Sequence, residues 1–116
     1  MTDYNVFPDY KTRKEIINGL CGKYKFIKHC FAGKSVCGRG IDVLHIGNTK
    51  NRVLYCGGFH GSEYLTVLAL LKFFEECCQA MQNDNPVGEY KIGNFLSIRG
   101  LTIVPCVNPD GTEIAL

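Results

Sequence analysis

The sequence of 116 residues lacks the features that mark several classes of protein. Its longest apolar stretch, residues 64–74, is interrupted by Lys72 and followed by Glu75 and Glu76, so it is too short and too charged for a membrane span. No basic segment followed by an apolar run opens the chain, so no secretory signal is visible, and we expect a cytoplasmic protein with no membrane partner. Lysine and arginine (13) exceed aspartate and glutamate (11) by only two, which gives no reason to expect a nucleic-acid partner.

Cysteine is abundant, but the spacings typical of cysteine chemistry are absent. The chain has seven cysteines, with no C-x-x-C pair and no zinc-ribbon spacing, at positions 21, 30, 37, 56, 77, 78 and 106. An odd number without these spacings indicates reduced thiols, several of which lie on apolar faces and should pack there as small hydrophobes.

The chain does contain a clear alternation of helical and strand patterns. Asp9 is a suitable N-cap for a helix over residues 9–22, and a longer helix is predicted over residues 63–82. Short runs rich in β-branched and aromatic residues predict four strands, at residues 24–31, 41–46, 52–56 and 101–107, the first two forming a hairpin. We therefore expect one α/β domain over residues 1–116, with a largely parallel sheet.

The helix predicted over residues 63–82 has two distinct faces. One face is apolar and should cover the sheet: Val67, Leu70, Leu71, Phe74, Cys77, Cys78 and Met81. The other face is polar and should meet solvent: Lys72, Glu75, Glu76, Gln79 and Asn83.

The strongest functional signal is a histidine and a carboxylate three positions apart, His60 and Glu63, directly after the strand at residues 52–56. Ligand sites of open α/β sheets lie beyond the carboxyl ends of strands, and the glycines at positions 57, 58 and 61 allow the sharp turn that this requires. An imidazole and a carboxylate suit zinc, which takes three protein ligands at a typical catalytic site. The pair therefore predicts part of a zinc site with one ligand still to be found.

A purely structural reading of this segment stays open. In it Glu63 is simply favoured by the helix dipole, and His60 has no role. The other candidate ligands also have structural readings: His29 and His45 alternate with apolar residues on strands, and Cys56 should belong to the core. Residues 108–111 read as a turn, in which Asp110 has no visible partner.

Three motifs, taken in order, resemble the first part of the zinc carboxypeptidase family. They are residues 33–41 followed by 44–48, residues 53–63 ending in His60-Gly61-Ser62-Glu63, and residues 103–111 ending in Asn108-Pro109-Asp110-Gly111. The resemblance runs over residues 24–111 and is strongest to the bacterial γ-D-glutamyl-diamino acid peptidases that act on murein peptides.

This resemblance implies a fold, a cofactor and a reaction. The fold would be the N-terminal portion of the three-layer, mixed-sheet zinc-exopeptidase architecture, and His60 and Glu63 would match the first two zinc ligands. The reaction would be hydrolysis of a peptide or isopeptide substrate by water that zinc activates. In the family the third zinc ligand, the arginines that bind the substrate carboxylate and the general-base glutamate come from further downstream. We therefore expect an incomplete domain that is inactive as an isolated chain.

Two alternatives remain for the isolated chain. It could be a non-catalytic binding or assembly module, because a sheet that ends after its fourth strand would expose an edge on which copies of the chain could pair as a homo-oligomer. In the other alternative, a neighbouring chain completes the zinc site across an interface.

Overall fold

A four-stranded mixed sheet organises the chain, and the computed structural model describes residues 1–83, 86–87 and 90–116. The strands are β1 (Lys28–Lys34), β2 (Gly40–Ile46), β3 (Arg52–Cys56) and β6 (Gly100–Val104), in the spatial order β1-β2-β6-β3. β2 is antiparallel to both β1 and β6, and only β3 and β6 are parallel. The largely parallel sheet expected from strand patterns is therefore wrong, while the mixed sheet implied by the family resemblance is present. The short connection between β1 and β2 permits only an antiparallel hairpin.

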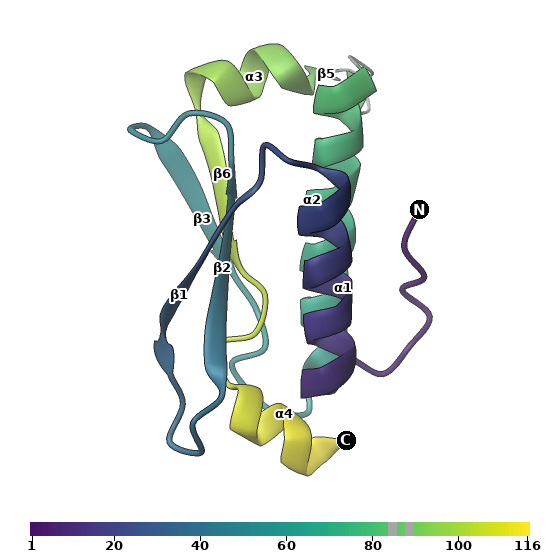
Figure 1. Cartoon of the computed structure of the whole chain (residues 1–116), viewed down its shortest axis with the longest axis vertical. Coiled ribbons are helices and arrows are strands. Elements are labelled where there is room, and N and C mark those ends of the chain that lie inside the picture. Colours follow the sequence, from purple (N-terminus) through teal and green to yellow (C-terminus); the bar gives the residue numbers. More distant parts are fainter. Residues whose placement is uncertain (84–85, 88–89) are drawn as a thin grey trace.

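Two long helices, α1 (Tyr10–Lys23) and α2 (Tyr64–Asn83), lie on the same side of the sheet (Figure 1). As predicted, Asp9 caps α1, its carboxylate accepting a hydrogen bond from the amide of Thr12 at 2.8 Å. The apolar faces of both helices and the inner face of the sheet form one core, which includes Ile17, Leu20, Leu44, Leu71, Phe74 and Ile103. These elements form two layers, a sheet and its helical cover.

The segment between α2 and β6 contains structure that the sequence patterns did not predict. The helix α3 (Ile92–Ile98) precedes β6, and a short antiparallel pair joins β4 (Pro86–Val87) to β5 (Tyr90–Lys91). The sequence patterns predicted no element between residues 83 and 100, and residues 84–85 and 88–89 of this segment fall outside the described residues. A further helix, α4 (Pro109–Ala115), begins inside the motif that was read as a turn. Asparagine at the N-cap followed by proline at the first helical position is typical of a helix start. The same two residues are also typical of a turn, which is why the sequence was read as one.

The prediction that Glu75 faces solvent is wrong, because the N-terminal segment covers it. Glu75 is fully buried, and its Oε1 accepts hydrogen bonds from the Tyr4 hydroxyl at 2.9 Å and from the Thr2 amide at 3.1 Å. Burial, together with the hydrogen bond to Glu75, raises the pKa of Tyr4 above its ordinary range. Helical periodicity describes one helix and contains no information about a distant segment that packs on its polar face.

The cysteines follow the prediction only in part, because Cys30, Cys37 and Cys56 are exposed. All seven are free, and Cys77 and Cys78 are buried in α2, where burial raises the pKa of the Cys77 thiol to about 11. Cys56, however, is exposed, which contradicts its predicted place in the core. Its strand, β3, lies at one edge of the sheet, so fewer neighbours cover it.

The free edges of the sheet also differ from the expectation. The last predicted strand, now β6, lies between β2 and β3 and is not an edge. Among the described residues, the outer strands are β1 and β3, and on β3 the side chains of Leu54 and Tyr55 are 59% and 49% exposed. None of the helices described is both long and apolar enough to cross a bilayer.

Candidate metal centre

The loop that carries His60 and Glu63 connects β3 to α2, at the carboxyl ends of the two parallel strands. Main-chain hydrogen bonds continue the β3–β6 pairing past the ends of both strands. The amide of Gly57 donates to Val104, that of Val107 to Gly57, and that of Asn108 to Gly58, at 3.1, 2.9 and 3.0 Å. The loop is thus built onto the segment that follows β6.

Gly58 allows the chain to turn at the start of this loop. Its φ of +65° lies in the left-handed region, which side chains disfavour. A Cβ there would also lie 2.9 Å from Cγ2 of Val67 and 3.1 Å from the Sγ of Cys106. Both the backbone angle and the close packing therefore require glycine at this position.

A tight turn brings His60 and Glu63 together. The amide of Glu63 donates to the carbonyl of His60 at 2.9 Å, and the hydroxyl of Thr66 donates to the carbonyl of Glu63 at 2.7 Å. The same hydroxyl accepts a hydrogen bond from the amide of Gly58 at 2.9 Å. The Nδ1 of His60 lies 3.1 Å from Oε1 of Glu63, and the two side chains are 78% and 51% exposed.

This arrangement fits two ligands of one zinc ion. Nitrogen and oxygen donors on a tetrahedral zinc lie about 3.3 Å apart, close to the separation of His60 Nδ1 and Glu63 Oε1. Among the described residues, no group of three or more His, Cys, Asp or Glu side chains is placed to hold a metal. The pair can therefore bind a divalent cation with two donors and leave the other coordination positions of the cation open. Without a cation, the two side chains can hydrogen-bond to each other.

The two other histidines are engaged elsewhere on the sheet. His45 on β2 is 5% exposed, its Nδ1 lying 2.7 Å from the Thr102 hydroxyl and its Nε2 lying 3.1 Å from the carbonyl of Gly47. His29 on β1 lies 2.7 Å from Oδ1 of Asp42 through its Nε2. Both are strand residues with polar partners, which agrees with their structural reading.

Asp110 has partners, contrary to the expectation from sequence. Its carboxylate accepts hydrogen bonds from the Ser35 hydroxyl, the Cys37 amide and Nη1 of Arg39, at 2.8, 3.0 and 2.8 Å. The Arg39 guanidinium, followed by the Cys37 and Ser35 donors, lowers the pKa of Asp110 to about 2. These donors are all on the hairpin turn between β1 and β2, more than 70 residues away in sequence.

The three sequence motifs that carry the family resemblance therefore meet at one end of the molecule. Asp110 at the start of α4 binds the hairpin turn, and Asn108, one residue before α4, donates through Nδ2 to the carbonyl of Phe59 at 3.1 Å. Figure 1 shows α4 at the same end of the sheet as the β1–β2 turn. The first turn of α4 connects the hairpin to the loop of His60 and Glu63.

Replacing Asp110 with asparagine should destabilise the chain near neutral pH and have less effect in acid. The unfolded carboxyl titrates at a pKa of about 3.9. In the folded chain its pKa is about 2, so the ionised form stabilises the fold above about pH 4, and this contribution is lost as the pH falls through about 2. The Tm difference between wild type and Asp110→Asn, measured across this range, should shrink with acid. Asp3→Asn is the control because Asp3 is exposed and, among the described residues, accepts only a local bond from the Asn5 amide. A Tm difference that stays constant with pH would contradict the claim that the ionised Asp110 carboxylate stabilises the fold.

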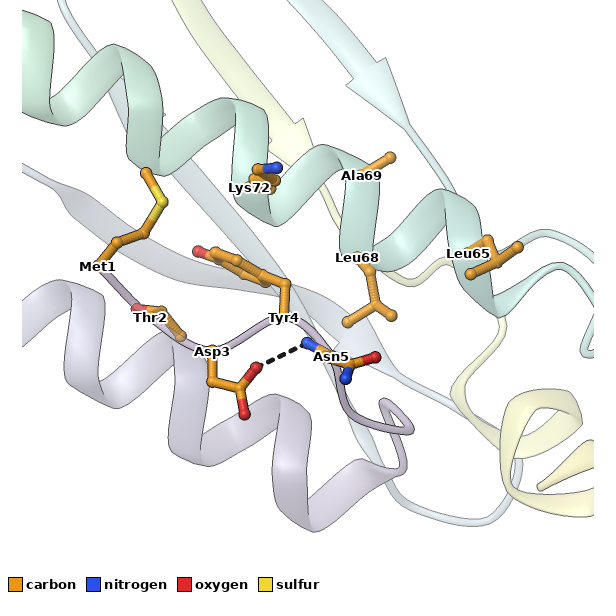
Figure 2. Close-up of a pocket in the computed structure, with 9 residues that line it drawn as sticks. All are labelled: Met1, Thr2, Asp3, Tyr4, Asn5, Leu65, Leu68, Ala69 and Lys72. Carbon is orange, nitrogen blue, oxygen red and sulfur yellow. Dashed lines mark hydrogen bonds between the residues drawn. The ribbon is translucent and has the colours of Figure 1, made fainter.

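A hollow lies apart from this centre, between the N-terminal segment and α2. Its volume is about 540 Å³, and the residues that line it, drawn in Figure 2, are Met1, Thr2, Asp3, Tyr4, Asn5, Leu65, Leu68, Ala69 and Lys72. Neither His60 nor Glu63 is among them. The hollow is therefore not a substrate pocket for the histidine–carboxylate pair.

Solved structures with the same arrangement of elements are carboxypeptidases and their relatives. Bovine thrombin-activatable fibrinolysis inhibitor, solved with a tick carboxypeptidase inhibitor, matches 95% of this chain with a TM-score of 0.77 and 19% identity. The match covers 34% of that protein. A metallo-carboxypeptidase from Burkholderia cenocepacia matches 94% of the chain and 29% of its own length, with a TM-score of 0.67 and 19% identity. The chain thus has the fold of part of a carboxypeptidase.

Sequence comparison gives the family. The profile described as zinc carboxypeptidase matches residues 14–116, and the chain belongs to this family. It is 29% identical over 108 residues to the gamma-D-glutamyl-L-diamino acid endopeptidase 1 of Lysinibacillus sphaericus, covering 93% of this chain and 27% of the relative. It is 35% identical over 92 residues to carboxypeptidase E of Caenorhabditis elegans, covering 72% of this chain and 18% of the relative. The chain spans less than a third of the length of these relatives.

Proposed function

We propose that this chain contributes part of a zinc metallopeptidase centre, with Nδ1 of His60 and the carboxylate of Glu63 as two of the zinc ligands. The observation that carries the proposal is the 3.1 Å separation of these two atoms at the carboxyl ends of two parallel strands. Zinc held there would supply Lewis-acid chemistry for peptide hydrolysis and make water a better nucleophile. The exposed positions of both side chains leave room for a peptide to approach.

Two substrate classes fit the family. Similarity to an endopeptidase named for γ-D-glutamyl-diamino acid bonds supports a murein peptide, and similarity to carboxypeptidase E supports a peptide with a free carboxyl end. We favour the murein peptide, because that match covers 93% of the chain and the match to carboxypeptidase E covers 72%.

We further propose that the 116 residues do not hydrolyse peptides by themselves. Two ligands hold zinc weakly compared with three, and a reaction also requires a positioned general base and groups that orient the substrate. The described residues place only the two donors at the centre. A partner chain that adds a ligand would raise both the affinity for zinc and the activity.

Zinc titration of the purified chain tests the ligand assignment. We expect one weakly bound ion per chain, and replacing His60 or Glu63 with alanine should reduce its affinity by about tenfold or more, since each removes one of two donors. Competition with a chromophoric chelator measures this affinity. Incubation with a γ-D-glutamyl-diaminopimelate peptide should yield no product.

His29→Ala is the matched control, since His29 already bonds to Asp42 on another strand. This control matters because three cysteines, Cys30, Cys37 and Cys56, are exposed and can also bind zinc. Equal zinc affinities for His60→Ala, Glu63→Ala and His29→Ala would refute the ligand assignment. Chelator-sensitive turnover of the peptide by the pure chain would refute its inactivity.

A second candidate function is assembly through the edge of the sheet. β3 is an outer strand among the described residues, and its exposed Leu54 and Tyr55 lie next to main-chain groups that another strand can pair with. Sedimentation at micromolar concentration should then show a dimer that Leu54→Lys dissociates. Val36→Lys, at a fully exposed hairpin position, should leave it intact. A monomeric wild type would rule this function out.

A further inference from the structure

We propose that Asn108 is a positioning residue for the His60 loop, in addition to capping α4; this inference rests on the proposed zinc site. Its side chain bonds in two directions. Oδ1 accepts a hydrogen bond from the amide of Gly111 at 3.0 Å, which caps the helix, and Nδ2 donates to the carbonyl of Phe59 at 3.1 Å. Phe59 immediately precedes His60, so this bond fixes the peptide group from which the histidine extends.

The main chain around Asn108 strengthens this link. The amide of Asn108 donates to the carbonyl of Gly58 at 3.0 Å, so the residue holds two successive carbonyl groups of the loop. On the far side of His60, Gly61 lies against Gly111, and a Cβ on Gly61 would be 2.1 Å from the Gly111 carbonyl oxygen. His60 is therefore flanked by two residues that both rest on the first turn of α4.

The chemistry requires an amide at position 108. An asparagine side chain combines an acceptor and a donor on one short group, whereas an aspartate has acceptors only. If the side-chain amide of Asn108 were flipped, its NH₂ group would face the Gly111 amide and its oxygen would face the Phe59 carbonyl. Only the orientation described above therefore satisfies both hydrogen bonds. Capping alone would be served equally well by aspartate or serine. The contact to Phe59 is what distinguishes asparagine.

This distinction separates positioning from capping in an experiment. Asn108→Asp keeps the acceptor for the Gly111 amide but places a carboxylate oxygen against the Phe59 carbonyl, which should displace the loop. Asn108→Ser also keeps a cap, adds no charge, and cannot reach Phe59 at the same time. Both variants should retain the cooperative thermal transition of the wild type and lose about tenfold in affinity for Zn²⁺, as do changes to groups that orient metal ligands.

Asn48→Asp provides the matched control. Asn48 accepts from the amides of Lys50 and Asn51 through Oδ1 and donates through Nδ2 to the carbonyl of Ser97, in the turn that precedes β3, at the opposite end of this strand from the His60 loop. The same chemical change there should leave the Zn²⁺ affinity unchanged. Wild-type affinity in both Asn108→Asp and Asn108→Ser would overturn the positioning role.

Amide hydrogen exchange without metal keeps this test separate from that of the zinc site. The amide of Glu63, which donates to His60, should exchange faster in both Asn108 variants than in the wild type or Asn48→Asp. If His60→Ala leaves the Zn²⁺ affinity unchanged, the wild type has no zinc site at His60 and the proposed function fails. Hydrogen exchange alone then tests the positioning role. Unchanged exchange at Glu63 would then overturn it.

Discussion

Replacing Gly61 with alanine should destabilise the chain by about 3 kcal/mol, near the upper end for an added methyl group in a tightly packed place. The new Cβ would lie 2.1 Å from the carbonyl oxygen of Gly111 and 2.4 Å from its carbonyl carbon. Both atoms belong to the main chain of α4, so no side-chain rotation can relieve the contact. Gly61 is not among the glycines with positive φ, so the effect is steric and does not come from backbone strain.

The loop and α4 must separate to accept this methyl group, which also breaks the bond from Asn108 to Phe59. Urea denaturation measures the loss, with the slope m as a check that the folded state stays compact. Gly19→Ala in α1 is the control, because a Cβ there meets nothing within 4 Å and should stabilise the helix by about 0.5–1 kcal/mol. A Gly61→Ala variant as stable as the wild type would show that the two main chains are not in contact.

Replacing Phe74 with alanine should cost about 3–5 kcal/mol, the largest loss that we expect from a single truncation. Phe74 is fully buried in α2, in the core cluster that includes Leu44 and Ile103 of the sheet. Removal of its ring leaves a cavity between the helix layer and the sheet. Since small domains have about 5–15 kcal/mol of stability in total, the variant would be near its unfolding transition at room temperature.

The neighbouring residue provides the comparison for this truncation. Phe73 is 38% exposed, and its ring lies 6.4 Å from that of Tyr55 on β3. Phe73→Ala should cost about 1 kcal/mol, mostly from the lost aromatic contact. Chemical denaturation of both variants under the same conditions measures the difference. Equal losses would contradict the assignment of Phe74 to the core.

Local patterns predicted most elements whose causes are local, although the Asn108-Pro109 start of α4 was read as a turn. The bounds of β3 follow from a run of apolar residues that ends at two glycines, and the start of α1 follows from the Asp9 cap. Helical periodicity placed α2 to within a residue at each end. Each of these signals involves residues a few positions apart, which a sequence displays directly.

Most features that the sequence did not predict depend on distant residues. The place of β6 between β2 and β3, which sets the mixed sheet, depends on a connection through α2 and α3. Glu75 is buried by Tyr4, 71 positions away, and Asp110 is paired with Arg39, also 71 positions away. At the candidate centre, the closeness of His60 and Glu63 follows from a local turn, whereas the support from Asn108 requires the pairing of β3 with β6. Pattern analysis of a single sequence cannot supply these long-range contacts.

The first turn of α4 has a mechanical consequence for the chain. Asn108 and Asp110 are two residues apart, yet one binds the loop before α2 and the other binds the turn after β1. Any tilt of this helix must therefore pull on both segments together. Lengthening or shortening the β1–β2 turn would shift α4 and, through α4, the backbone of residue 60. A change far from the proposed zinc ligands can therefore still alter the orientation of the His60 imidazole.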